Sequence, residues 1–121
     1  MPFNVLENTV GGKNVELPAG SNLQDQIKKL IASSPVFLFM KGTPDSPMCG
    51  FSANVVRILN DQQVSFNSFD ILLNGEVRQA VKDFSNWPTY PQLYIKGELI
   101  GGNDIVMEML KTGELKKVLE N

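Results

Sequence analysis

Histidine is absent from this chain of 121 residues, and cysteine occurs once, at position 49. The lack of histidine excludes most nucleophile–base triads and most zinc sites, because both depend on an imidazole. A single cysteine cannot form an internal disulfide, so packing alone must hold the fold. That is typical of a reducing intracellular compartment, without distinguishing cytoplasm from mitochondrial matrix or plastid. Cys49 is therefore the remaining candidate for a reactive side chain.

A surplus of positive charge is also lacking. The chain has 11 lysines and arginines against 13 aspartates and glutamates, a formal net charge of -2. Nucleic-acid binding needs a basic face, so we expect no nucleic-acid partner. No apolar run approaches the ~20 residues of a membrane span, and no signal or typical transit peptide is visible, so we expect no membrane partner.

The apolar pattern begins only after the first 21 residues. Residues 1–21 have no sustained period and are interrupted by glycines and prolines, so we expect a flexible N-terminal lead-in followed by one domain over 22–121. Helical spacing then predicts helices over 21–33, 50–61, 76–84, 103–112 and 114–119. Strand-like patterns predict strands over 36–40 and 64–71 and a hairpin around 96–97. This order predicts an α/β fold, a mixed four-stranded sheet flanked by helices on both faces.

Cys49 follows a polar loop broken by prolines and directly precedes a predicted helix. The free amides of a helix's first turn stabilise an anion by ~0.3–1 kcal/mol, so we expect a thiol with a lowered pKa. Lys41, before the loop, is a candidate neighbouring cation, although a solvated lysine explains it equally well. The simplest alternative for Cys49 is a small buried apolar side chain.

Ser52 occupies the place of the second cysteine in a Cys-x-x-Cys redox sequence. A hydroxyl cannot attack a disulfide, so any mixed disulfide at Cys49 must wait for a thiol from another molecule.

Four segments together resemble the monothiol glutaredoxins of the CGFS class. They are "KGTP" (41–44), "CGFS" (49–52), "NWPTYPQLY" (86–94) and "GELIGGNDI" (97–105). The resemblance covers about residues 22–119 and implies the thioredoxin fold, in agreement with the predicted element order. It also implies that the outside thiol is glutathione.

The resemblance assigns one end of glutathione to two basic residues. Lys41 and Arg78 would bind the glycine carboxylate, and Arg78 and Lys82 form a basic edge on one predicted helix. Without the resemblance, solvated surface charges explain these residues as well. Tyr90-Pro91 resembles a family segment with a cis proline bond, which would free the Tyr90 main chain to bind the cysteinyl backbone. A proline that merely starts a strand is the ordinary alternative.

The other end of glutathione is assigned to the helix that begins near Asn103. The amides around Asn103 and Asp104 would bind the γ-glutamyl carboxylate, and the Asp104 side chain would bind the amino group. An N-cap without a ligand explains Asp104 equally well. Trp87 we assign mainly to structure, and Phe51 to a wall near the ligand or a dimer partner.

Three functions follow as hypotheses. A 2Fe–2S cluster usually has four thiolate ligands, so the resemblance implies a homodimer with Cys49 of each chain and two glutathiones, delivering the cluster to apo iron–sulfur proteins or serving iron homeostasis. The alternative is a glutathione-dependent thiol–disulfide oxidoreductase, whose activity the resemblance implies to be weak or absent. The third is an interaction module with an inert cysteine.

Overall fold

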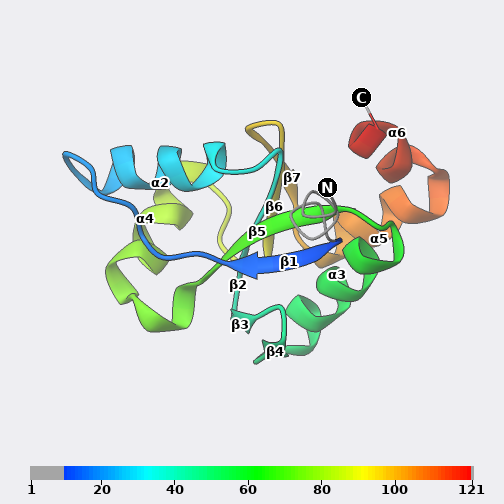
Figure 1. The fold of residues 1–121 in the computed structure, drawn as a ribbon, viewed down its shortest axis with the longest axis horizontal. Helices are drawn as coiled ribbons and strands as arrows, with labels where there is room; N and C mark the ends of the chain where they lie inside the picture. Colours follow the sequence, from blue (N-terminus) through cyan, green and yellow to red (C-terminus); the bar gives the residue numbers. More distant parts are fainter. Residues whose placement is uncertain (1–9, 121) are drawn as a thin grey trace, which may run out of the picture.

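Five strands form one mixed sheet in the computed structural model, which describes residues 10–120 (Figure 1). Their order across the sheet is β1-β5-β2-β6-β7. The bounds are β1 (Gly11–Asn14), β2 (Val36–Met40), β5 (Ser65–Asp70), β6 (Gln92–Ile95) and β7 (Glu98–Gly101). The β1–β5 and β2–β5 pairs are parallel, and the β2–β6 and β6–β7 pairs are antiparallel. A separate short ladder of β3 (Gly42–Thr43) and β4 (Ser46–Pro47) lies in the loop before Cys49.

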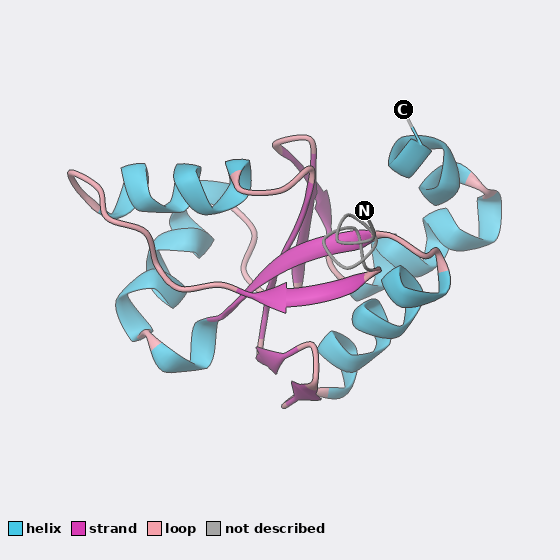
Figure 2. Cartoon of the chain, in the orientation of Figure 1, coloured by secondary structure: helices cyan, strands magenta, loops and turns pink. Residues whose placement is uncertain are grey.

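Helices cover both faces of this sheet, as Figure 2 shows. They are α2 (Leu23–Ala32), α3 (Gly50–Asp61), α4 (Gly75–Ser85), α5 (Asn103–Thr112) and α6 (Glu114–Glu120), with a 3-10 turn η1 (Ile71–Leu73) after β5. One core cluster contains buried residues of α2 and α4, and the other contains buried residues of α3, α5 and α6. None of the helices within residues 10–120 is both long and apolar enough to cross a membrane.

Strand β2 supplies side chains to both clusters. Successive strand side chains point to opposite faces, so Phe37 and Phe39 pack with α2 and α4 whereas Leu38 and Met40 pack with α3 and α5. All four are fully buried. Burial of each such side chain contributes about 1.5–3 kcal/mol, which explains why this segment is apolar without interruption.

The predicted element order and the mixed four-stranded sheet with helices on both faces are confirmed in β5-β2-β6-β7. The sheet has one strand more than predicted, because Gly11–Asn14 pairs with β5 along its outer edge. Within the expected lead-in, residues 11–14 are therefore part of the sheet, and Val15 and Leu17 pack against the α2 and α4 core. Residues 1–9 lie outside the described residues.

The composition of β1 explains why this strand was missed. Glycine has low strand propensity, but here it is required, since a Cβ on Gly12 would lie 2.4 Å from the Phe66 ring and 2.7 Å from Cγ of Pro44. The strand is held mainly through its backbone, and the Val15 amide continues the pairing by donating to the Ser68 carbonyl at 2.8 Å.

Asp70, at the end of β5, fixes the loop that leads to Cys49. Its buried Oδ1 accepts a hydrogen bond from the Gly42 amide at 2.9 Å and another from the Leu72 amide at 3.0 Å. At the other end of the loop, the Met48 amide donates to the Lys41 carbonyl at 2.9 Å. The loop therefore returns the chain to the sheet directly before Cys49.

We expect Asp70→Ala to lower the free energy of unfolding by about 1–3 kcal/mol, because the buried Gly42 amide and the partly buried Leu72 amide lose their acceptor. Asp70→Asn keeps a carbonyl oxygen for those amides and should be destabilised less. Denaturant unfolding of the three proteins measures both effects. Equal stability of Asp70→Ala and the wild type would contradict this role of the carboxylate.

Candidate functional site

A groove of about 130 Å³ lies where three segments far apart in the sequence meet. It is lined by Phe51 from the start of α3, by Trp87, Thr89, Tyr90 and Pro91 from the loop before β6, and by Gly102, Asn103, Asp104 and Ile105 from the start of α5. Three of the predicted site residues, Tyr90, Asn103 and Asp104, are thus brought together. The first turn of α3 ends the groove on the side of Cys49.

Cys49 is the N-cap residue of α3 and is partly exposed, so its predicted place at the opening of a helix is confirmed. The Ser52 amide holds the pKa of the Cys49 thiol below its usual value, and the Phe51 amide and the positive charge of Lys41 act in the same direction. Partial burial of the sulfur opposes this shift without cancelling it. The thiolate is therefore stabilised mainly by the open end of its own helix.

Ser52 has a structural role that the sequence did not reveal. Its side chain is fully buried, and its Oγ accepts a hydrogen bond from the Lys41 amide at 3.2 Å. A hydrogen bond between the Ser52 side chain and Cys49 also lowers the thiol pKa. The serine that replaces a second cysteine thus fastens the end of β2 to the first turn of α3.

Two helices begin at the groove without a side-chain cap. In α2 and α4, asparagine side chains cap the first turn: Asn22 Oδ1 accepts from the Asp25 amide at 2.9 Å, and Asn74 Oδ1 accepts from the Val77 amide at 3.1 Å. The N-cap residues of α3 and α5, Cys49 and Gly102, make no such bond. Free helix amides attract anions, so this arrangement suits a thiolate at α3 and a carboxylate at α5.

Tyr90 joins the groove to α4 through its side chain. The Tyr90–Pro91 peptide bond is cis, as the family resemblance implied. The buried phenol donates a hydrogen bond to the Arg78 carbonyl at 2.6 Å, and burial raises the pKa of Tyr90 far above its usual value. The ring is therefore an anchor in the core, and the predicted ligand contact of Tyr90 is through its main chain.

Gly102 allows α5 to approach the loop closely. A Cβ at this position would lie 3.2 Å from the Pro91 carbonyl oxygen and 3.6 Å from Nε1 of Trp87. That indole nitrogen is buried and has no hydrogen-bond partner. Trp87, assigned mainly to structure from the sequence, thus also lines the groove, as does Phe51 with its largely exposed ring.

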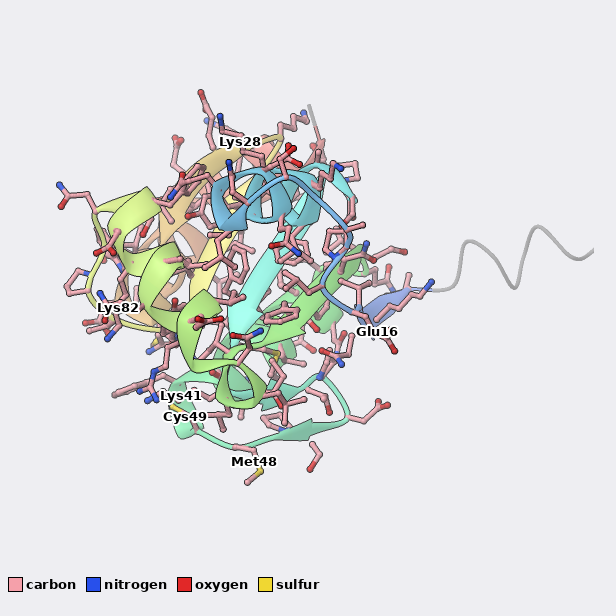
Figure 3. All side chains as sticks on the ribbon, turned by 90° about the vertical axis from the view of Figure 1, so that its left-hand side faces the viewer. Glu16, Lys28, Lys41, Met48, Cys49 and Lys82 are labelled. Atoms are coloured by element: carbon pink, nitrogen blue, oxygen red, sulfur yellow. The ribbon has the colours of Figure 1, made fainter. Side chains whose placement is uncertain are left out.

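The basic residues of the site are free of ion pairs within residues 10–120. The salt bridge found there joins Lys29 Nζ to Asp25 Oδ2 at 3.4 Å, away from Lys41, Arg78 and Lys82. Figure 3 shows Lys41 beside Cys49, with Lys82 on the same side of the molecule. These cations are available to an anionic ligand, and the roles of Lys41 and Arg78 toward glutathione stay a prediction.

Comparison with known proteins finds similar sequences and folds. The family model described as Glutaredoxin matches residues 36–100. Monothiol glutaredoxin-S17 of Arabidopsis thaliana is 62% identical over 98 residues, which cover 81% of this chain but 20% of that protein. An uncharacterized monothiol glutaredoxin of Synechocystis sp. is 48% identical over 95 residues, 78% of this chain and 89% of that protein.

A solved structure shows the same fold. The solution structure of reduced poplar apo GrxS14 has a TM-score of 0.74 and 50% identity, covering 81% of this chain and 90% of that one. The chain spans about a fifth of the length of two plant relatives, 20% of Monothiol glutaredoxin-S17 of Arabidopsis thaliana and 21% of Monothiol glutaredoxin-S11 of Oryza sativa subsp. japonica.

We expect Lys41→Gln to raise the pKa of Cys49, because the thiolate loses a nearby positive charge. The thiolate fraction at neutral pH would fall, and alkylation by iodoacetamide would slow accordingly. Lys82→Gln is the matched control, since Lys82 does not contribute to the Cys49 shift. Thiolate absorbance followed against pH measures the change; an identical midpoint in Lys41→Gln and wild type would contradict it.

Proposed function

The chain belongs to the glutaredoxin family, and on this premise we propose that it binds glutathione at Cys49 and delivers a 2Fe–2S cluster to apo iron–sulfur proteins as a glutathione-ligated homodimer. The observation that supports this most directly is the single, partly exposed thiol with a lowered pKa at the uncapped end of α3. Its neighbour in the Cys-x-x-Cys pattern is a buried serine, so a partner thiol must come from another molecule.

Residues in the groove, together with Lys41 and Arg78 outside its lining, are complementary to the parts of glutathione. The glycine carboxylate would meet the unpaired cations Lys41 and Arg78, and the cysteinyl backbone would pair with the main chain of Tyr90. The γ-glutamyl carboxylate would bind at the uncapped start of α5, with the exposed Asp104 carboxylate binding the amino group. Each end of the tripeptide carries a carboxylate, and the uncapped start of α5 favours an anion.

Ligand counting favours a shared cluster. Within residues 10–120 no group of three or more histidine, cysteine, aspartate or glutamate side chains is placed to hold a metal. One chain supplies one thiolate, so two chains and two glutathiones would complete the four that a 2Fe–2S cluster usually has. The dimer would take up and release the iron and sulfide of the cluster together, as one unit. A thiol with a lowered pKa fits this role, because a metal ligand must be deprotonated.

A glutathione-dependent oxidoreductase is the second candidate, and the same lowered pKa favours it. The Cys49 thiolate would attack the glutathionyl sulfur of a mixed disulfide, and the substrate would leave as a thiolate. A second glutathione thiolate would then attack the glutathionyl sulfur on Cys49, regenerating the enzyme and forming glutathione disulfide. An inert cysteine agrees less well with a partly exposed, stabilised thiolate.

Reconstitution with iron, sulfide and glutathione is expected to give a coloured dimer, observed by visible absorption and light scattering. Cys49→Ser should remain colourless because it removes the thiolate ligand. Omission of glutathione should also abolish the colour, since each chain supplies only one thiolate. A colourless monomer under complete conditions would refute the carrier proposal, and a stable cluster without glutathione would refute the shared ligand set.

Turnover of a glutathionylated peptide separates the second candidate from the first. If the chain is primarily a cluster carrier, release of the peptide thiol should be slow and should disappear in Cys49→Ser. Fast, sustained turnover by a protein that takes up no cluster would favour the oxidoreductase instead. A dithiol glutaredoxin measured in parallel supplies the reference rate.

A further inference from the structure

A relay of side-chain hydrogen bonds joins α3 to α5 next to the groove. Nδ2 of Asn54 donates to Oδ1 of Asn103 at 2.6 Å, although the two residues are 49 positions apart in the sequence. Arg57 donates to the oxygen of the Asn54 amide, and Nδ2 of Asn103 contacts the Met107 sulfur at 3.6 Å. Both asparagines are half-buried. Within residues 10–120 this is the side-chain hydrogen bond that connects the two helices.

This bond lies close to the two uncapped helix ends. Asn103 is the first residue of α5, immediately after Gly102, and Asn54 lies in the second turn of α3, shortly after Cys49. The bond therefore sets the spacing between the amides that stabilise the thiolate and the amides at the start of α5. Hydrogen bonds of this kind typically stabilise one arrangement by a modest amount, enough to change a binding constant several-fold.

The Asn103 side chain is also kept away from its own helix end. Asparagine side chains readily bond to nearby backbone amides and would then compete with a ligand there. Here both the oxygen and the nitrogen of the Asn103 amide have partners, on Asn54 and Met107. The amides at the start of α5 consequently stay open toward the groove, where Asn103 and Asp104 line the wall.

We propose that Asn54 and Asn103 form a positioning pair that holds the start of α5 at the distance from Cys49 that the γ-glutamyl carboxylate of glutathione requires. The inference rests on the proposed glutathione site and adds a residue, Asn54, that lies outside the groove lining. The pair acts through the helix end and touches neither the thiol nor the glycine carboxylate. Its effect is therefore confined to one end of the ligand.

Two ligands that cannot react with Cys49 test whether the effect is limited to the γ-glutamyl end. They are S-methylglutathione and S-methylcysteinylglycine, which lacks the γ-glutamyl group. Asn54→Ala and Asn103→Ala should each weaken S-methylglutathione binding by roughly three- to tenfold. Binding of S-methylcysteinylglycine should stay at the wild-type level. NMR titration of the complete chain follows both ligands, including weak binding. Asn60→Ala, the same change at an exposed position in the last turn of α3, should bind both probes like the wild type.

Further variants separate positioning from general damage. The Asn54→Ala/Asn103→Ala double variant should lose no more affinity than either single variant, because the Asn54–Asn103 hydrogen bond is absent from all three proteins. Asn54→Gln keeps an amide donor and should recover part of the affinity. The thiolate titration of Cys49 should not move, since the Ser52 and Phe51 amides and Lys41 stay in place.

Several results would overturn the positioning pair. They are equal loss of affinity for both probes, no loss for either probe, or additive losses in the double variant. A wild-type chain that fails to bind S-methylglutathione would instead refute the proposed glutathione site, so the two failures are distinguishable.

Discussion

The contact between the Cys49 sulfur and the first-turn amides of α3 is the interaction on which the site depends. A cysteine at the N-cap position leaves the helix without the oxygen acceptor that asparagine provides in α2 and α4. The sulfur itself satisfies this need when it is ionised, so the lowered pKa and the missing cap have one cause. Chemistry and local helix stability are linked through the same amides.

The rest of the fold keeps that helix end in place. Strand β2 is buried from both sides and supplies a rigid base. The two residues that follow it, Lys41 and Gly42, donate their amides to Ser52 of α3 and to Asp70 of β5. The thiol is thus held by neighbours on two elements of the core, although the loop before it is partly exposed. Rigid support of a reactive group on a loop is a common arrangement in binding sites.

Local patterns made much of this predictable from the sequence. The helix over 76–84 and the strand over 36–40 were predicted because repeated burial leaves a periodic apolar signal. Cys49 could be placed at a helix opening from the polar loop before it and the apolar period after it. Strand β1 gives no such signal, because Gly11 and Gly12 contribute backbone pairing and no side-chain pattern.

Contacts between distant segments were not predictable. The sequence shows Ser52 as an absent thiol, whereas its buried hydroxyl becomes meaningful only when β2 and α3 are packed. Nor does any local signal connect Asn54 with Asn103.

The two-layer core has a further consequence. Tyr90 belongs to the cluster on the α2 and α4 side, while α3 and α5 pack on the other. A molecule bound in this groove would link the two layers, so its binding should raise the melting temperature of the protein as the ligand concentration increases.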